Sequence, residues 1–344
     1  MQQLTLVAPR TFEWREVPEP VLGGERAALV APLAVASCDL DPDIIHGRTG
    51  HGLPIAFGHE FVGEIVAVGS AVERFAVGDV VAVAFQISCG TCDACGRDHT
   101  ASCRAVPPLA AYGLGEARGT WGGALSDLVR VPYADAMCVR IPPGLDPLAV
   151  ASASDNIADG HRNVAGPLAA RPGAPVLVVG GHYGSIGLYT LDMALALGSE
   201  AVTYVDHDPD RLALARAAGA TVIDAADGYP AKIAGEFPIT VNCGTAEGLA
   251  TAIRSTASNG VCTNTVIFWD NLQPLPLLEM YLNPITLRTG RINSRAHLAH
   301  VIDLAAQGRI HPERFTDRIV PWHQAAEVLA NPRHKTVIVR QPAK

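Results

Sequence analysis

The sequence predicts an α/β protein with two domains, one rich in β-strands and one built on a doubly wound parallel sheet. Three observations support this prediction: the length of 344 residues, a change of pattern near residue 150, and a glycine-rich turn near residue 180. A chain of this length is too long for one ordinary hydrophobic core, so two domains are the natural expectation. Apolar residues make up 49% of the chain and charged residues 17%, as in well-packed soluble proteins.

The first 150 residues read as short strands interrupted by glycine and proline. Extended runs are predicted over 26–32, 61–68 and 79–83, and the last of them follows the turn Gly78-Asp79. Residues 1–150 are therefore expected to form the β-rich domain. A helix over 296–307 and a strand over 335–339 are predicted near the C-terminus.

From residue 176 the pattern becomes an alternation of strands and helices. Helices are predicted over 186–197, 209–217 and 247–257, and apolar strands over 176–180, 201–205, 221–224, 238–242 and 261–268. Strands without a polar face are typical of a parallel sheet covered by helices on both faces. Residues 151–290 are therefore predicted to form one doubly wound domain.

Charge and hydropathy exclude several classes of partner. The net charge is −8, the isoelectric point is about 5.8 and the mean hydropathy is +0.20. Lysine and arginine are scattered, which argues against a nucleic-acid groove or an anionic membrane surface as partner. No apolar run approaches the ~18 residues that a membrane helix needs, and the first twenty residues do not resemble a targeting signal. A cytoplasmic protein is expected.

Four cysteines are spaced C-x2-C-x2-C-x7-C in a loop rich in glycine and aspartate: Cys89, Cys92, Cys95 and Cys103. Four thiolates this close can surround one tetrahedral Zn²⁺ and leave no coordination position open, as in structural zinc sites. The alternatives are two disulfides or unrelated free thiols. Disulfides are rare in intracellular enzymes, so we favour structural zinc.

The run VLVVGGHYGSIGLYTLDMALALG reads as a strand, a glycine turn and a helix. Such a turn lets backbone N–H groups approach a pyrophosphate at the helix N-terminus, as in the Rossmann fold. The spacing is irregular, because two extra residues separate Gly180 from the second half of G-x-G-x-x-G. The residues expected at this nucleotide site are Gly180, Gly181, Gly184, Ser185, Ile186 and Gly187.

Asp206 strengthens the nucleotide prediction, because it ends the next strand nineteen residues after Gly187. A carboxylate there would accept hydrogen bonds from an adenosine ribose and repel a 2′-phosphate, which favours NAD over NADP. Arg211 could reach the same ribose or the adenine. The alternative is a flavodoxin-like sheet that uses its glycines only for packing.

Cys38, His59 and Asp155 offer one sulfur, one nitrogen and one oxygen ligand from distant parts of the chain. Three protein ligands would leave a fourth zinc position for substrate or water, as in catalytic zinc sites. Each residue alone has a plainer interpretation, as a core thiol, a buried histidine and a helix cap. Asp41 is a candidate to orient His59 through its second ring nitrogen.

The whole chain resembles the zinc-containing medium-chain alcohol dehydrogenases. The segments that carry the resemblance are REVPEP (15–20), GHEFVGEIVAVGSAVERFAVGDVVAV (58–83), the four-cysteine loop, WGGALSDLV (121–129), the glycine turn with Asp206, and KTVIV (335–339). Together they cover nearly the full length.

The resemblance implies a GroES-like catalytic domain, formed by residues 1–150 with 291–344, interrupted by a Rossmann domain over 151–290. The structural-zinc lobe would span 88–104. It also implies that Cys38, His59 and Asp155 bind catalytic zinc, that Glu60 is an alternate zinc ligand, and that Arg295 contacts the cofactor pyrophosphate or Glu60. Aspartate at the third ligand position is similar to the formaldehyde dehydrogenase branch.

The implied activity is hydride transfer between NAD and an alcohol, aldehyde or ketone, in an enzyme with two zinc ions per chain. The proton relay departs from the family, which usually has a hydroxyl residue at the position of Leu40 and often a histidine at that of Asp43. Proton release through His46, water or ribose hydroxyls is a hypothesis. Asp159, where the family often has threonine, is a further departure.

Two alternatives remain open: a reductase of conjugated double bonds, and a non-enzymatic member that retains nucleotide binding. Family members are dimers or tetramers, and the region 285–290 could extend a sheet between two copies. The sequence does not identify the substrate.

Overall fold

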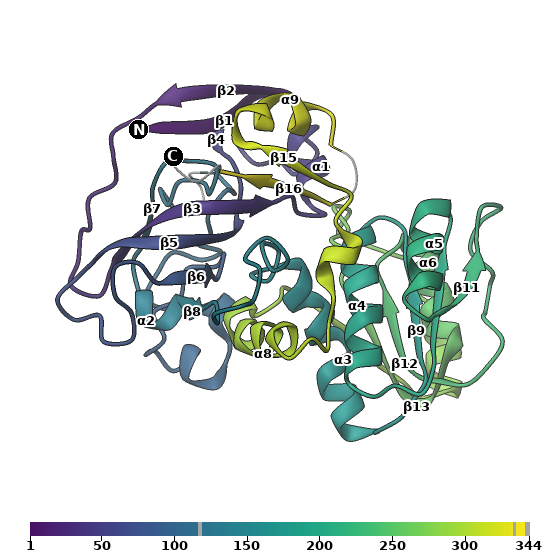
Figure 1. Cartoon of the computed structure of the whole chain (residues 1–344). Coiled ribbons are helices and arrows are strands. Elements are labelled where there is room, and N and C mark those ends of the chain that lie inside the picture. The colour runs from purple at the N-terminus through teal and green to yellow at the C-terminus, as the bar shows by residue number, and fades with distance from the viewer. Residues whose placement is uncertain (116–118, 333–334, 341–344) are drawn as a thin grey trace. The chain divides into compact units, whose positions relative to one another are not determined.

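The computed structural model describes residues 1–115, 119–332 and 335–340, which Figure 1 shows coloured along the chain. The chain divides into two compact units. Unit 1 contains Met1–Ala158, Ile292–Gly308 and Thr316–Lys344, and unit 2 contains Asp159–Arg291 and Arg309–Phe315. The functional domain bounds expected from the sequence, at residues 150 and 290, remain a prediction.

Unit 1 is built on two sheets. Within the described residues, a seven-stranded sheet has the order β15 (Arg318–Pro321), β16 (Thr336–Val339), β3 (Ala28–Ala36), β5 (Glu60–Val68), β6 (Val80–Val83) and β8 (Cys138–Arg140), with β7 (Val129–Val131) paired to β3. A smaller sheet has the order β2 (Thr11–Glu16), β1 (Gln2–Ala8) and β4 (Ile55–Ala56). Leu4 and Leu6 of β1 belong to the same buried core as Phe61 and Ile65 of β5.

The register of three strands brings distant residues together at one end of the larger sheet. β3 and β5 are antiparallel with Ala36 opposite Glu60, and β16 is antiparallel to β3 with Val337 opposite Ala36. The residues just after β3, just before β5 and just before β16 therefore meet at the same sheet end.

Short helices complete unit 1: α1 (Asp41–Ile45), α2 (Ala134–Met137), α8 (Ser294–Ala306), α9 (Ala325–Ala330), and the 3-10 turns η1 (Cys95–Arg97), η2 (Thr100–Ser102) and η5 (Trp322–Gln324). Helix α3 (Asn156–Ala170) begins in unit 1 and ends in unit 2. None of the helices that the structure describes is long and apolar enough to cross a lipid bilayer.

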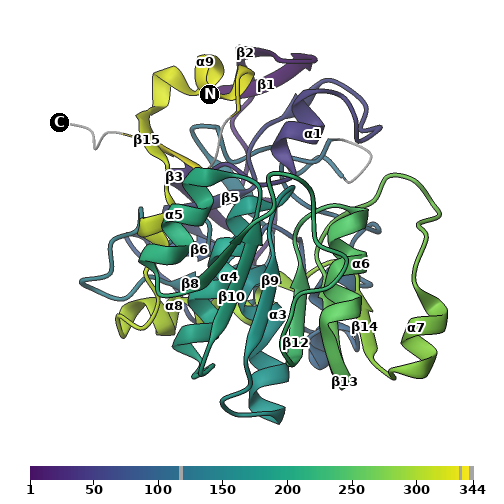
Figure 2. The same cartoon turned by 90° about the vertical axis from the view of Figure 1, so that its right-hand side faces the viewer.

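Unit 2 contains the predicted doubly wound parallel sheet (Figure 2). Its order is β11 (Thr221–Asp224), β10 (Val202–Asp206), β9 (Val176–Val179), β12 (Phe237–Asn242), β13 (Thr256–Asn264) and β14 (Thr286–Thr289). All neighbouring pairs are parallel. Counted along the chain, this is the order 3-2-1-4-5-6 of the Rossmann fold.

The helices of unit 2 are α4 (Gly184–Ala196), α5 (Pro209–Ala217), α6 (Ala246–Ser255) and α7 (Leu277–Leu282), with the 3-10 turn η4 (Pro312–Phe315). The predicted helix 209–217 and strand 221–224 have these bounds in the structure. The strand predicted over 261–268 instead spans Thr256–Asn264, because α6 ends at Ser255 and the chain becomes extended at Thr256. β-Branched residues such as threonine favour extended backbone.

Candidate active site

Cys38, His59, Glu60 and Asp155 form one buried cluster in unit 1. One ligand atom from each of these residues lies within 4.8 Å of the others. The strand register explains why Cys38 and His59 lie close together. Cys38 lies two residues beyond Ala36 of β3, and His59 directly precedes β5. Asp155 precedes α3. The sequence-predicted ligands are therefore brought together.

Gly58 sets the turn that presents His59. Its φ is +89°, and a Cβ at this position would lie 3.1 Å from Val35 Cγ1 and 3.2 Å from Leu125 N. Any other residue would be strained by the backbone angle and by the close packing. The imidazole Nε2 of His59 then lies 3.3 Å from Asp155 Oδ2.

The cluster holds more acidic groups than positive charge. Burial, followed by the charges of Asp155 and Glu60, raises the pKa of Cys38 well above its usual value. Burial raises the pKa of Glu60 to about 8. Burial alone would lower the pKa of His59, but its hydrogen bond with Asp155 and the charge of Asp41 raise that pKa to about 9. These shifts retain protons that a divalent cation would displace on binding.

The donor atoms fit zinc. Cys38 Sγ lies 3.3 Å from Asp155 Oδ2, and the sulfur, imidazole nitrogen and carboxylate oxygen are all ligands that Zn²⁺ accepts. Glu60 Oε1 is buried and has no hydrogen-bond partner among the described residues. An unsatisfied buried oxygen beside three ligand atoms is consistent with the predicted role of Glu60 as an alternate ligand.

Lys335 is a buried cation at this site that the sequence analysis missed. Its Nζ lies 3.3 Å from Glu60 Oε2 and donates to Asn156 Oδ1 at 2.6 Å. Ser152 donates to the same Glu60 oxygen, and Lys335 Nζ donates to Ser152 Oγ at 3.2 Å. The one signal in the sequence was a lysine at the start of the apolar strand KTVIV, where β16 enters next to β3.

Asp41 has a different role from the one predicted. Its Oδ2 accepts a hydrogen bond from the backbone N–H of Cys38 at 2.8 Å, and the described residues include no hydrogen bond between Asp41 and His59. Asp41 therefore fixes the loop that carries Cys38, and it acts on His59 through its charge. Asp43 pairs with Arg48 at 2.7 Å, and Asp159 pairs with Arg162 at 2.6 Å.

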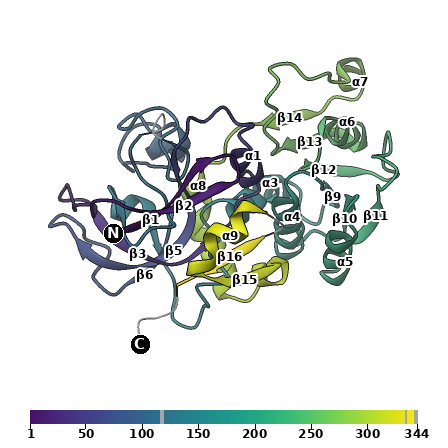
Figure 3. The same ribbon diagram turned by 90° about the horizontal axis from the view of Figure 1, so that it is seen from above.

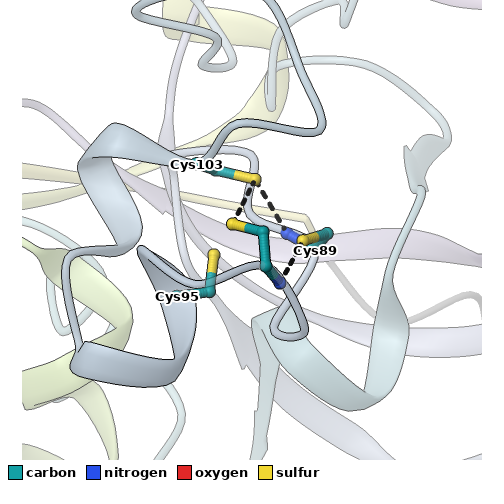
Figure 4. A group of neighbouring side chains, drawn as sticks. Cys89, Cys95 and Cys103 are labelled. Atoms are coloured by element: carbon teal, nitrogen blue, oxygen red, sulfur yellow. Dashed lines mark hydrogen bonds between the residues drawn. The ribbon is translucent and has the colours of Figure 1, made fainter.

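The four cysteines Cys89, Cys92, Cys95 and Cys103 gather in a second cluster, with Sγ atoms within 4.8 Å of one another. Figure 4 shows the sulfurs of Cys89, Cys95 and Cys103 directed toward a common centre. The Cys92 and Cys103 sulfurs are 4.0 Å apart, close to the ~3.8 Å edge of a tetrahedron with zinc–sulfur distances of ~2.3 Å. All four are free thiols rather than disulfides.

Backbone N–H groups favour the thiolate forms of Cys89 and Cys92, whereas burial raises the pKa of Cys95 and of Cys103. Cys92 N–H and Thr91 N–H point at Cys89 Sγ at 3.3 and 3.4 Å, and Cys89 N–H points at Cys103 Sγ at 3.3 Å. The N–H of Arg104, 3.5 Å from Cys92 Sγ, is the main cause that lowers the pKa of Cys92 to about 6. Four sulfurs gathered within 4.8 Å of one another fit a structural zinc ion.

The glycine turn of unit 2 joins β9 to α4, which begins at Gly184. Gly181 has a φ of +132°, and the N-cap residue Tyr183 makes no side-chain cap. A helix N-terminus after a glycine turn fits a pyrophosphate. Ser185, Ile186 and Gly187 lie in the first turn of α4, which begins two residues before the helix predicted over 186–197.

Asp206 lies at the end of β10 as predicted, but its carboxylate is fully engaged with the protein. The side chain is 0% exposed, and Arg211 Nε donates to Oδ2 at 2.8 Å. The prediction that Asp206 accepts ribose hydroxyls therefore does not match this geometry. Arg295, in unit 1, donates to Ala136 O at 2.7 Å; the cation beside Glu60 is Lys335, so the suggested contact of Arg295 with Glu60 is not supported.

Comparisons with known proteins agree with this fold and these clusters. Residues 24–143 match the alcohol dehydrogenase GroES-like domain. A protein of Mycobacterium tuberculosis named "Probable zinc-binding alcohol dehydrogenase" is 31% identical over 93% of this chain and 82% of its own length. The glutathione-independent formaldehyde dehydrogenase of Pseudomonas aeruginosa is 29% identical over 65% of this chain, and the match covers 58% of that enzyme.

Solved structures support the same conclusion. An alcohol dehydrogenase of Thermus sp. superposes with a TM-score of 0.89 at 26% identity, covering 99% of this chain and 100% of its own. A protein of Sinorhizobium meliloti, named as a zinc-binding dehydrogenase and bound to NADP, has a TM-score of 0.83 at 26% identity over 98% of both chains. The chain belongs to the zinc-containing medium-chain alcohol dehydrogenase family. The predicted fold class, a GroES-like domain with a Rossmann domain, is confirmed.

Proposed function

We propose that this chain is a zinc-dependent oxidoreductase that transfers hydride between an alcohol and a nicotinamide dinucleotide, or in reverse to an aldehyde or ketone. The observation that carries the proposal is the buried convergence of Cys38, His59 and Asp155. Three protein ligands are the number found at catalytic zinc, whereas a structural site uses four. We assign a second, structural zinc to the four-cysteine lobe.

Zinc at the first cluster would supply Lewis-acid polarisation of the substrate oxygen, and the nicotinamide would exchange hydride with the substrate carbon. The residues of the chain hold the ligands in place. Asn156 Nδ2 donates to Cys38 Sγ at 3.4 Å, and Lys335 holds Asn156 through its Oδ1. The Phe85 ring lies 5.4 Å from the His59 ring and keeps water from that side of the ligand.

Proton movement is the least conventional part of the proposed reaction. Leu40 has no group that passes a proton, and its backbone N–H points at Cys38 Sγ at 3.4 Å. The exposed His46 contacts Pro42 O through Nδ1 at 2.6 Å, which leaves Nε2 as the nitrogen that can exchange protons with solvent. We therefore keep His46 and water as the proposed route of proton release.

A panel of alcohols and aldehydes, including formaldehyde, tests the proposed function. We expect at least one substrate to change the absorbance of NADH or NADPH, and elemental analysis to find about two zinc ions per chain. Reduction of conjugated double bonds with one zinc, confined to the lobe, would instead favour the alternative reductase. Nucleotide binding without turnover of any substrate would favour a non-enzymatic member.

We also propose that the chain assembles through the outer edge of unit 2. β14 ends the parallel sheet and pairs only with β13 among the described strands, and α7 lies at the periphery beyond α6 (Figure 3). Side chains of α7 and its approach are exposed although apolar: Leu272, Leu277, Leu278, Tyr281 and Leu282. An open strand edge beside such a patch is a surface that a second copy would cover.

Charged substitutions on α7 test this assembly. The double variant Leu278→Glu/Tyr281→Glu is expected to be monomeric, because two carboxylates cannot be buried unpaired in an apolar interface. Light scattering after size exclusion would measure the molar mass, with Val77→Glu, an exposed apolar site in unit 1, as the matched control. A wild-type chain that is already monomeric at micromolar concentration would contradict the proposal.

A further inference from the structure

We propose that Asp206 does not select NAD in this chain, and that the protein binds NADPH about as tightly as NADH. The inference rests on the proposed function, since it requires a nicotinamide dinucleotide at the glycine turn. It concerns the adenosine end of that nucleotide, where a free carboxylate would accept the ribose hydroxyls of NAD and repel the 2′-phosphate of NADP.

The carboxylate of Asp206 is already used by five protein donors. Oδ1 accepts from His207 N–H at 2.8 Å, from Asp208 N–H at 3.0 Å and from Arg211 Nη2 at 2.8 Å. Oδ2 accepts from Tyr204 Oη–H at 2.8 Å and from Arg211 Nε at 2.8 Å. A carboxylate offers about four lone-pair positions, so these contacts leave no place for a ribose hydroxyl.

The charge of Asp206 is compensated as well. Arg211 binds both carboxylate oxygens, the fork geometry that makes arginine–carboxylate pairs strong, and its side chain is only 10% exposed. Burial opposes ionisation of Asp206, but its bonds with Arg211 lower its pKa below the usual value. The pair therefore stays ionised and neutral in sum, which weakens the repulsion between Asp206 and a 2′-phosphate.

Asp208, the second acidic residue near the end of β10, also has its carboxylate bonded within the protein. Asp208 is the N-cap of α5, where Oδ1 accepts from the N–H groups of Asp210 and Arg211, each at 3.0 Å. Its Oδ2 lies 3.4 Å from Arg211 Nη1. His207, between these two acidic residues in the chain, has a half-exposed side chain, and its imidazole can donate a hydrogen bond to a phosphate.

The glycine turn packs directly against the side chains of Tyr204, Asp206 and Arg211. A Cβ at Gly180 would lie 2.4 Å from Asp206 Oδ2 and 2.5 Å from Tyr204 Oη, and a Cβ at Gly184 would lie 2.7 Å from Arg211 Cδ. These two glycines are therefore required for the Tyr204–Asp206–Arg211 group to pack beneath the turn. Freeing Asp206 for a ribose would mean breaking a buried ion pair, which is costly.

Direct titration of the zinc-loaded protein with NADH and with NADPH, followed by nicotinamide fluorescence, tests the inference. We expect the two dissociation constants to agree within about fivefold, or roughly 1 kcal/mol. Asp206→Asn leaves the Arg211 guanidinium unpaired, so it is expected to shift the ratio toward tighter NADPH binding.

Arg211→Met is expected to raise the dissociation constant of NADPH at least about tenfold relative to that of NADH, because it uncovers the Asp206 charge. Arg216→Met, an exposed arginine on the same helix, is the matched control and should leave the ratio unchanged. Tyr204→Phe removes a single donor and should shift the ratio in the same direction by less. Circular dichroism and zinc content verify that each variant is folded.

Two results would overturn the inference. If the wild-type chain binds NADH more than about a hundredfold tighter and Asp206→Asn rescues NADPH, then Asp206 reads the ribose as in NAD-selective relatives of the fold. That outcome leaves the proposed function intact. A folded, zinc-loaded chain that binds neither nucleotide would overturn the proposed function together with the inference, and so is distinguishable from the first result.

Discussion

Replacing Cys38 with alanine is expected to remove one of the two zinc ions and to lower kcat/KM by more than about 100-fold, since loss of even a residue that only orients a ligand costs roughly 10–100-fold. His59 and Asp155 would remain, but two protein ligands bind zinc far more weakly than three. The buried carboxylates of Glu60 and Asp155 would then lack the zinc cation that adds to the positive charge of Lys335. Elemental analysis and steady-state kinetics measure the two effects.

Cys138→Ala is the matched control for this variant. Cys138 is as buried as Cys38 and also lies in unit 1, but it belongs to neither metal cluster. It should keep both zinc ions and most of the activity. A Cys38→Ala protein that keeps two zinc ions and wild-type kcat/KM would show that the ligands of the reactive zinc lie elsewhere.

The sequence predicted the candidate ligands that converge in the first cluster, but it did not predict the residues that surround them. Cys38, His59 and Asp155 are recognisable because thiolate, imidazole and carboxylate are zinc-ligand types and the family resemblance implies these positions. Lys335, Ser152 and Asn156 are not typical zinc ligands, so their residue types do not point to the site. Lys335 reaches it through strand register, because β16 lies next to β3 and brings Lys335 to the end of β3. Pairing between strands that are about 300 residues apart is not encoded in any local pattern.

Asp206 shows a second limit of sequence patterns. Its position at the end of the second strand is predictable from spacing alone, and the structure confirms that position. Whether its carboxylate faces a ligand or the protein depends on Tyr204 and Arg211, two residues before it and five after it. The residue type predicts a negative charge at this position. Whether the carboxylate of Asp206 is available to a ligand depends on how it packs beneath the glycine turn.

The Rossmann sheet was predictable because uniformly apolar strands alternate with helices that end at glycine. The β-rich unit was harder, because its strands are short and their order in the sheet depends on distant pairs such as β3 with β16 and β7. The apolar exposure of α7 was also not foreseen. No helix was predicted over Leu277–Leu282, and nothing local distinguishes a core face from a face that another copy would cover.

Replacing Cys95 with alanine is expected to remove the lobe zinc and to lower the melting temperature by at least about 5 °C, because roughly 2 kcal/mol shifts the melting temperature by about 4–8 °C in a unit of this size. The buried hydrophobic cluster of the lobe consists of Cys89, Cys95 and Cys103, and the partly buried hydrophobic residues packed against it are Cys92, Val106 and Tyr133. Because this apolar area is small, we expect a bound metal ion to supply much of the stability of the lobe. Structural zinc supplies on the order of 10 kcal/mol in small metal-folded domains.

Zinc content and limited proteolysis distinguish a local loss of structure in the lobe from a general loss of packing. Zinc content should fall from about two to about one per chain, and limited proteolysis should cut first within 88–104. Cys262→Ala removes a buried thiol outside both clusters and should keep both zinc ions and an intact lobe. If Cys95→Ala instead retains two zinc ions and the wild-type melting temperature, the four sulfurs do not hold a metal, and the lobe must be stabilised by its hydrogen bonds alone.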